Sequence, residues 1–472
     1  MITSQQRYTT RPFADALNEL LERRGSGTDT RVNLGEFLRR VEGWREGTLR
    51  KQIASERTLQ AEAVKAIAEA LNVAPEYFLE YRRHQINQAV QVHPELVDLV
   101  YDLLVSRARS IEAMTVPFVT TALDLLVDGK DIDAGMASKV LEMIMEGKVS
   151  DVQATAFLTA LRTKGESAEE IVGLARTMRK YGTPVDLGPG VDALDIVSTG
   201  GDHLASFNVS TTASFVAAAA GVVIAKHGNR GQTSRAGAAD LLQGLGARID
   251  LPPQAIAQCV REVGFGFMFA PLHYKATRNL ATVRRILGIR TIFNFLGPIL
   301  NPAGVKRQLT GVSEARFVPV LAEALAQMGS THAMLVHGEN GLDEISISGD
   351  TLVVEVKNGV CGAPFVINPE MFGLERFPSK SVFGGSLNRN VEITRRVLAG
   401  EPGPPLDIVL LNAGAAIYLA GVAADITEGI EKAREAVLAG KAWDKMAAFV
   451  ECTHTSEAGA TDEAWSEAGT AT

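Results

Sequence analysis

The chain has 472 residues, 46% of them hydrophobic and 22% charged, a composition typical of soluble globular proteins with about two to four domains. The net charge of −8 excludes a protein that binds nucleic acid over its whole surface, so any DNA contact must be local. Three widely spaced cysteines, Cys259, Cys361 and Cys452, argue against a disulfide framework and favour a reducing cytoplasm. The N-terminus has no apolar signal segment and the apolar runs are short, so we expect no membrane partner.

Residues 1–85 carry the pattern of a small helical domain. Apolar side chains recur at helical spacing from Phe13 onwards, and Asn33 and Thr58 are placed to cap a second and a fourth helix. A third helix is expected over residues 46–55, with Leu49 turned inward. The residues that would point outward from it are Arg45, Thr48, Arg50 and Lys51. Short helices joined by a glycine turn, with polar outward residues, are typical of a helix-turn-helix.

The same stretch, VNLGEFLRRVEGWREGTLRKQIASERTLQAEAVKAIAEALNVAPEYFLEYR, resembles the Cro/phage-repressor type of helix-turn-helix over about residues 13–83. Its closing ALNVAPEYFLEYR is the most specific part. In that family the third segment enters the DNA major groove, which implies DNA contacts by Arg45, Thr48, Arg50 and Lys51. The alternative is a dimerisation or docking module whose basic residues are only solvated, and the nearby acidic residues weaken the positive potential.

Residues 86–115 are interpreted as a helical connector and residues 116–185 as a second small helical domain. Ser150 with Gln153, and Ser167 with Glu170, have the spacing of helix caps, and the two helices would join at Lys164-Gly165. At the other end of the chain, residues 455–472 are small, polar and acidic, which predicts a disordered tail.

Residues 186–454 show alternating strand and helix patterns, which predict an α/β domain with a mainly parallel sheet covered on both faces. The expected strands are residues 194–197, 222–225, 248–251, 333–336 and 352–355. Expected helices include residues 236–245 and 317–328.

The first polar turn of this domain is STGGD, after the apolar run LDIV. Adjacent glycines let the backbone approach a ligand and expose successive N–H groups. Asn208, Ser210 and Thr211 then open a helix, and a helix N-terminus with hydroxyl groups favours phosphate. An ordinary tight turn is the alternative for this motif taken alone.

A second polar turn, KHGNR, follows the next expected strand. Lys226 offers a point charge and Arg230 a fork suited to phosphate or carboxylate, and Thr233, Ser234 and Arg235 would open the next helix. In parallel sheets both turns would lie at the carboxyl edge of the strands, where ligands bind.

Two further clusters are charged. Asp343 and Glu344 are adjacent carboxylates that favour a bound cation such as Mg²⁺. Arg284-Arg285 lies among apolar residues and calls for an anion, with the turn Gly297-Pro298 as a nearby wall.

STGGD, NVST, KHGNR, VRRILGIRTIFNFLGPILNP and GLDEIS, in this order, resemble the anthranilate phosphoribosyltransferase family over about residues 116–451. The resemblance implies a small helical domain plus a large α/β domain, a fold shared with pyrimidine nucleoside phosphorylases. It implies transfer of phosphoribose from phosphoribosyl pyrophosphate to anthranilate in tryptophan biosynthesis, with Mg²⁺ as cofactor. It also implies a homodimer formed through the helical domain, so one two-fold axis could serve a palindromic DNA site.

The resemblance assigns roles to matching positions. Phosphoribosyl pyrophosphate would contact Ser198, Thr199, Gly200, Gly201, Asp202, Asn208, Ser210, Thr211, Lys226, Asn229 and Ser234. Anthranilate would contact His227, Asn229, Arg284 and Pro298, and the metal would be held by Ser210, Asp343 and Glu344. No general base is assigned, because an aryl amine is already neutral and nucleophilic.

Two other functions stay open from the sequence. Ser198 stands where the family usually has glycine, and a serine at this position resembles the nucleoside phosphorylases. Another acceptor, such as a pyrimidine-type base, is therefore one alternative. The other is a DNA-binding regulator that senses phosphoribosyl pyrophosphate through a domain without activity.

Overall fold

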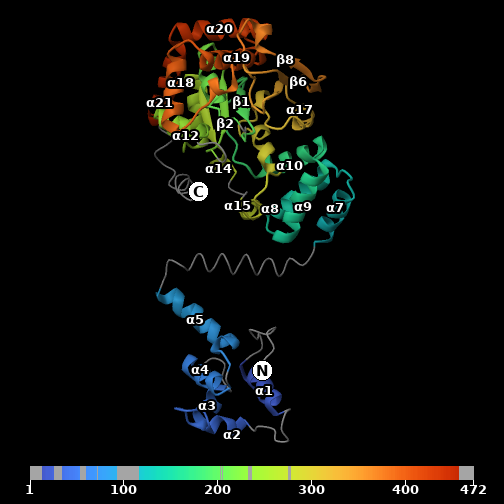
Figure 1. Cartoon of the computed structure of the whole chain (residues 1–472), viewed down its shortest axis with the longest axis vertical. Coiled ribbons are helices and arrows are strands. Elements are labelled where there is room, and N and C mark those ends of the chain that lie inside the picture. The colour runs from blue at the N-terminus through green and yellow to red at the C-terminus, as the bar shows by residue number, and fades with distance from the viewer. Residues whose placement is uncertain are drawn as a thin grey trace. The chain divides into compact units, whose positions relative to one another are not determined.

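The computed structural model describes residues 13–25, 34–53, 60–71, 73–92, 116–201, 204, 206–231, 236–274 and 278–455. The chain divides into two compact units, Met1–Ala108 and Arg109–Thr472 (Figure 1). The boundaries predicted at residues 85, 115 and 185 stay predictions, and the predicted tail lies outside the described residues except for Thr455. Within the described ranges, no helix has both the length and the hydropathy needed to cross a membrane.

The described part of the N-terminal unit is helical. Its elements are α1 (Phe13–Gly25), α2 (Leu34–Arg39), α3 (Glu46–Ile53), α4 (Ala61–Ala70), the 3₁₀ turn η1 (Pro75–Tyr77) and α5 (Leu79–Val92). Phe13, Leu38, Leu49 and Phe78 are buried at its centre, where the Phe13 and Phe78 ring centroids lie 4.6 Å apart. The predicted cap of the fourth helix is wrong, because α4 begins at Ala61 with Gln60 in the cap position. Thr58 and Asn33 lie outside the described residues.

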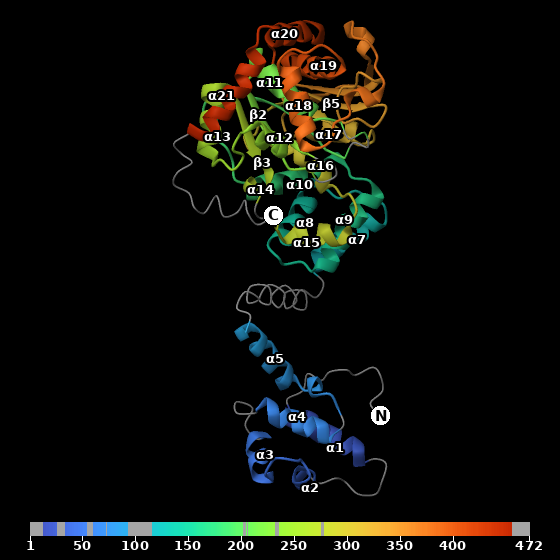
Figure 2. The ribbon, with the colours of Figure 1, turned by 60° about the vertical axis from the view of Figure 1, so that its left-hand side comes forward.

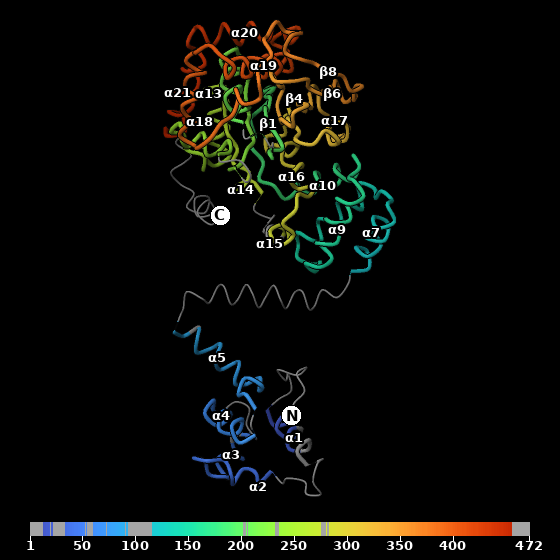
Figure 3. Tube along the Cα trace, in the orientation of Figure 1, coloured from blue at the N-terminus to red at the C-terminus, as the bar shows by residue number. Residues whose placement is uncertain are grey.

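A bundle of helices opens the second unit: α7 (Pro117–Val127), α8 (Ala134–Met145), α9 (Asp151–Lys164) and α10 (Ala168–Tyr181). The predicted caps are confirmed, because Ser150 Oγ accepts from the Gln153 N–H and Ser167 forms a capping box with Glu170. Two helices that follow much later in the sequence are α15 (Arg278–Leu287) and α16 (Phe293–Leu296). Of these, α15 packs against α8 and α9 (Figure 3).

The α/β part is built on one sheet. Its strands are β1 (Leu194–Ser198), β2 (Ile224–Gly228), β3 (Phe265–Phe269), β4 (Arg307–Gly311), β5 (His332–Gly338), β6 (Thr351–Lys357), β7 (Val360–Cys361) and β8 (Phe365–Ile367). The order is β3-β2-β1-β4-β5-β6-β7, with β8 also paired to β6. The first five strands of this order are parallel, and β6 to β8 are antiparallel. The strand order reverses between β1 and β4, and such a switch point opens a crevice at the carboxyl edge.

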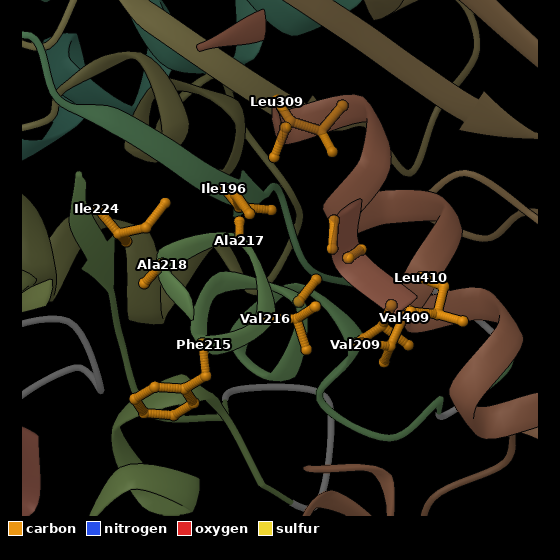
Figure 4. Packing of buried hydrophobic residues seen from close by; sticks show 14 of the residues in the cluster. Ile196, Val209, Phe215, Val216, Ala217, Ala218, Ile224, Leu309, Val409 and Leu410 are labelled. Carbon is orange, nitrogen blue, oxygen red and sulfur yellow. The ribbon is translucent and has the colours of Figure 1, made fainter. Parts of the chain in front are cut away.

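Helices cover both faces of this sheet (Figure 2). The remaining elements are α11 (Val209–Ala219), α12 (Ala238–Leu245), α13 (Pro253–Val263), α14 (Ala270–His273), η4 (Gly297–Ile299), α17 (Phe317–Gln327), η5 (Pro369–Phe372), η6 (Ser379–Val382), α18 (Leu387–Leu398), α19 (Pro404–Leu419), α20 (Ile426–Leu438) and α21 (Lys441–Thr455). On one face, Phe215 and Val216 of α11 pack with Ile196 of β1 and Val409 of α19 (Figure 4). On the other face, α17 packs on β5 and β6 and also contacts α10, which joins the helical bundle to the sheet. The predicted fold class is therefore confirmed.

The strand predictions need three corrections. Residues 248–251 do not form a strand, and the Arg248 N–H donates to the Thr453 side chain (3.1 Å) rather than to a neighbouring strand. Four strands were missed: β3 is a short apolar run, β4 has polar residues that face the core, and β7 and β8 have only two and three residues. β2 begins at Ile224 and runs on to Gly228, so it contains Lys226 and His227.

Two of the three cysteines lie close together in space although they are far apart in the sequence. Cys259 on α13 and Cys452 on α21 are both buried, and their sulfur atoms lie 2.8 Å apart. All three cysteines are free thiols in the structure.

Candidate active site

A cavity of about 510 Å³ opens at the carboxyl edge of the sheet. It is lined by the ends of β1 and β2, the start of α11, part of α15 and the loop after β5. The residues predicted to bind phosphoribosyl pyrophosphate, anthranilate or metal, as far as the structure describes them, all line it: Ser198, Thr199, Gly200, Gly201, Asn208, Ser210, Thr211, Lys226, His227, Asn229, Arg284, Pro298, Asp343 and Glu344. Asp202 and Ser234 lie outside the described residues.

The glycine turn after β1 is held on its sheet side. Gly200 and Gly201 have φ of +65° and +81°, a conformation that side-chain-bearing residues rarely adopt. The Thr199 N–H donates to Gly311 O (2.9 Å), and its hydroxyl lies 3.0 Å from that of Ser313. The turn thus projects from the switch point between β1 and β4 into the cavity.

The N-terminus of α11 forms the floor beside this turn. Its cap residue, Asn208, donates through Nδ2 to Ala236 O (3.0 Å) and accepts from Asn390 (3.1 Å), which ties the helix to the second turn and to α18. Thr211 is 1% exposed, and its hydroxyl has no hydrogen-bond partner among the described residues. A buried hydroxyl at a helix N-terminus is suited to an anionic ligand that supplies the missing partner.

Lys226 of β2 is a buried cation at the back of the cavity, 1% exposed. Its ammonium group donates to Ile196 O. Burial lowers its pKa, and the carboxylates of Asp195 and Glu344 oppose that shift. Burial also raises the pKa of Asp195 to about 6, against the opposing effect of Lys226.

Asp195 positions the neighbouring histidine. Its two carboxylate oxygens accept from the His227 backbone N–H (3.2 and 3.3 Å), and Oδ2 also accepts from Asn301 Nδ2 (2.8 Å). Burial lowers the pKa of His227 to about 3, so its ring is neutral near pH 7. Because Nδ1 lies 3.1 Å from Gly297 O, which can only accept, Nδ1 carries the proton and Nε2 keeps its lone pair.

The second turn is ordered by a carboxylate in the first turn of α12. Asp240 accepts from the N–H groups of Gly231 (2.9 Å) and Gly237 (2.8 Å) and pairs with Arg230 (2.8 Å). The predicted helix start at residues 233–235 is wrong, because α12 begins at Ala238 with Gly237 as its cap. Arg230, proposed from the sequence as a ligand fork, is therefore paired with Asp240 of α12.

The acidic pair lies in the loop after β5, and both carboxylates are 5% exposed. Gly311 makes room for this loop, since a Cβ there would lie 1.6 Å from Asp343 O. Asn412 of α19 fixes the following residue, accepting from the Ile345 N–H (3.0 Å) and donating to its carbonyl (2.9 Å). Glu344 Oε1 accepts from the Ser210 N–H (3.1 Å), so this carboxylate sits at the start of α11.

This donor set fits magnesium. Two buried carboxylates face a cavity that also holds the Ser210 segment. In the described part of the chain, no group of three or more His, Cys, Asp or Glu residues is placed to hold a metal ion. Mg²⁺ commonly takes one or two carboxylates and completes its shell with waters and ligand phosphates.

Of the paired arginines, the structure brings only one into the cavity. Arg284 on α15 lines it, with its guanidinium 5.7 Å from the centre of the Phe293 ring, and burial lowers its pKa. Arg285 is exposed, which corrects the prediction that both call for an anion. Pro298 is buried in the opposing wall, in the turn η4.

Three functional neighbours were missed from the sequence. Asp195 looks like an interruption of an apolar strand, and Asn301 stands before a proline in a turn. Arg290 also lines the cavity, but one arginine in a basic segment carries no distinctive signal. Their common feature, contact with residues far away in the chain, cannot be read from local spacing.

Comparison with known proteins agrees with this geometry. Two family models match: the glycosyl transferase family, a/b domain, over residues 190–443, and the glycosyl transferase family, helical bundle domain, over residues 120–182. An anthranilate phosphoribosyltransferase of Rubrobacter xylanophilus is 48% identical over 330 residues, which are 70% of this chain and 96% of that protein. The chain belongs to the anthranilate phosphoribosyltransferase family.

Solved structures of this family share the fold. The anthranilate phosphoribosyltransferase of Thermus thermophilus is 40% identical with a TM-score of 0.67, covering 71% of this chain and 99% of that one. The Saccharomyces cerevisiae enzyme, solved in complex with phosphoribosyl pyrophosphate and magnesium, is 29% identical with a TM-score of 0.65, covering 71% and 98%. The family models begin at residue 120, so they leave the N-terminal unit outside the match.

Proposed function

We propose that this chain transfers the phosphoribosyl group of phosphoribosyl pyrophosphate to the amino nitrogen of anthranilate. A C–N bond forms at the anomeric carbon, the bond to pyrophosphate breaks, and the amine loses one proton. The observation that carries the proposal is the convergence in one cavity of a glycine turn, a helix N-terminus, an acidic pair and Arg284. Membership of the family supports it.

The donor is assigned to the side of the cavity formed by β1, β2 and α11. The turn from Ser198 to Asp202 would take the diphosphate, with Asn208, Ser210 and Thr211 on the phosphate at the helix start. Lys226, Asn229 and Ser234 complete this set. The buried cation and the N–H groups are placed before reaction, so they stabilise leaving-group charge without reorganising.

Asp343, Glu344 and Ser210 would hold magnesium. When bound, the ion would neutralise charge on the departing pyrophosphate. The hydrogen bond between Glu344 and the Ser210 N–H keeps this carboxylate beside the phosphate segment of α11.

The acceptor is assigned to the other side of the cavity. Arg284 would bind the anthranilate carboxylate, Asn229 would contact the ring substituents, and Pro298 would cover the ring. The unprotonated His227 Nε2 can accept a hydrogen bond from the amino group, which directs the nitrogen lone pair. No general base is assigned, because the neutral aryl amine attacks before it loses its proton.

A steady-state assay of the purified full chain tests this function. The substrates are phosphoribosyl pyrophosphate, magnesium and a panel containing anthranilate, other aromatic acids and pyrimidine bases, and we expect turnover with anthranilate. Transfer to a pyrimidine base alone would support the alternative suggested by Ser198. Donor binding without turnover on any acceptor would support a sensor.

For the N-terminal unit we propose sequence-specific DNA binding. Leu49 of α3 is buried while Arg45, Thr48, Arg50 and Lys51 are exposed, so the helix presents one polar face. Arg50 and Arg39 pair with Glu46 (3.0 and 3.2 Å), and these exposed pairs can exchange for phosphate contacts at little cost. Selection from genomic fragments, followed by a salt series, tests the proposal, and absence of any enriched sequence would favour a protein–protein module.

We also propose a homodimer, which would suit a palindromic DNA site. Its support is a set of exposed apolar side chains on the helical bundle, Phe118, Val127 and Val152. Sedimentation of the wild type and of Val152→Lys tests it, and a wild-type monomer at micromolar concentration would contradict it.

A cytoplasmic location is proposed as well, supported by the three free thiols.

A further inference from the structure

Arg290 contacts the glycine turn through two of the turn's backbone carbonyl groups. It lies between α15 and α16, and its Nη2 donates to Gly200 O (3.0 Å) while Nη1 approaches Gly201 O (3.5 Å). Thr199 is tied to Gly311 and Ser313. The turn is therefore held both by the sheet and by a guanidinium group.

This contact fixes where the turn's N–H groups point. The peptide between Gly200 and Gly201 is trans, so its N–H is antiparallel to the carbonyl that Arg290 holds, and it points away from the guanidinium. A Cβ at Gly201 would lie 2.1 Å from Arg290 Nη1, so the two groups are packed together without space for a side chain. A side chain at Gly201 would therefore displace the guanidinium group.

The guanidinium is itself held on an aromatic platform. Its central carbon lies 4.8 Å from the centre of the Phe295 ring, which stacks on Phe317 at 3.9 Å between centroids. Arg162 of α9 lies 6.0 Å from the Phe295 centre and pairs with Glu314 (3.2 Å). Cation–π contact and stacking keep the planar group in one orientation. The platform thus links the helical bundle to the turn.

The charge of Arg290 acts on the same region. Burial lowers its pKa, and the carboxylates of Glu314 and Asp343 oppose that shift, so this guanidinium lies in the field of one member of the acidic pair, Asp343. It remains a cation, because arginine does not lose its proton in proteins.

We propose that Arg290 is a positioning residue for the diphosphate turn: it orients the Gly200–Gly201 peptide so that its N–H can bind the pyrophosphate of the donor. This rests on the proposed function, which assigns that turn to phosphoribosyl pyrophosphate. Arg290 acts through the turn, whereas the acceptor side, with Arg284 and His227, does not depend on it.

The test compares donor and acceptor constants in the full-length Arg290→Ala variant. We expect the KM for phosphoribosyl pyrophosphate to rise about tenfold or more and kcat to fall by as much as about 10²-fold, the scale for small misplacements of a binding group. The KM for anthranilate should change less than about twofold, since that side of the cavity keeps its contacts. Arg290→Lys should recover part of the loss, and added guanidinium should rescue Arg290→Ala.

Arg316→Ala is the matched control. Arg316 also stacks on the platform, 4.3 Å from the Phe317 ring centre, but its side chain is 47% exposed and does not line the cavity. We expect its donor constants to equal those of the wild type. Equal damage to donor and acceptor constants in Arg290→Ala, with no rescue by guanidinium or by Arg290→Lys, would overturn the proposal in favour of a general structural role.

Calorimetric titration with phosphoribosyl pyrophosphate and magnesium, without acceptor, separates this proposal from the function it rests on. If the wild type binds the donor but does not use anthranilate, the proposed reaction fails while the binding comparison still tests Arg290. An Arg290→Ala variant that binds the donor as tightly as the wild type would overturn the positioning role. Failure of the wild type to bind the donor would overturn both.

Discussion

Charged side chains have different surroundings in the two units of the molecule. In the N-terminal unit, Arg45, Arg50 and Lys51 are exposed on and beside α3. In the transferase unit, Lys226 is 1% exposed and Asp343 and Glu344 are each 5% exposed, all facing one cavity. A buried charge costs free energy unless a partner or ligand compensates it, whereas an exposed charge costs almost nothing. Buried charges around a cavity therefore indicate a ligand. Exposed charges do not indicate one by themselves, so the function of the N-terminal unit has to be tested by a binding experiment.

The largest effect is expected at the acidic pair. Glu344→Gln keeps an oxygen that can accept from the Ser210 N–H but removes the charge proposed to hold magnesium. We expect kcat to fall by about 10²-fold or more, the scale for loss of a preorganised electrostatic group. Glu339→Gln, an exposed carboxylate at the start of the same loop, is the control and should be unaffected. Wild-type turnover in Glu344→Gln would mean that the charge of Glu344, like an exposed surface charge, does not contribute to turnover.

A substrate-selective effect is expected at Arg284. Arg284→Ala should raise the KM for anthranilate about 30-fold or more while leaving the donor KM nearly unchanged, since losing one partner of a buried charge pair costs about 2–5 kcal/mol. The exposed neighbour Arg285 provides the control, and steady-state kinetics of Arg285→Ala should match the wild type. Equal changes for both substrates would mean that Arg284 supports the fold rather than the acceptor.

A pH-dependent effect on stability is expected at Glu166, which is 6% exposed in the helical bundle. Burial raises its pKa from the ordinary 4.5 to about 6. A raised carboxyl pKa favours the folded state below the unfolded value, and this contribution is lost as pH rises through the folded value. Glu166→Gln should therefore raise the free energy of unfolding by up to about 2 kcal/mol near pH 8 and have almost no effect near pH 4. Urea titrations across this range measure it, with exposed Glu169→Gln as control.

The smallest effect is expected at the exposed charges. Arg50→Ala should lower DNA affinity about tenfold or less and reduce the slope of log affinity against log salt by about 1, as for one lost phosphate contact. Lys65→Ala, an exposed lysine on α4, should leave both unchanged. Identical binding by the two variants would mean that the α3 face is only a solvated surface.

The sequence alone determined the elements whose signals are local. The caps Ser150 and Ser167 and the glycine turn lie where their spacing placed them. Where local signals were weak, prediction failed: β4 carries polar residues, and residues 248–251 have a strand pattern but no neighbouring strand. A strand exists only when another strand pairs with it, and that pairing is not local.

The sequence also supplied the residue types of the site, because phosphate, metal and carboxylate each call for a short list of side chains. Only the tertiary structure decided which of two adjacent arginines lines the cavity, how Asp195 holds the His227 backbone, and that Arg290 meets the glycine turn. The Arg290–Gly200 contact joins residues 90 positions apart. The crossover between β1 and β4, not the spacing of any motif, brings such segments to one edge of the sheet, so their contacts appear only after folding.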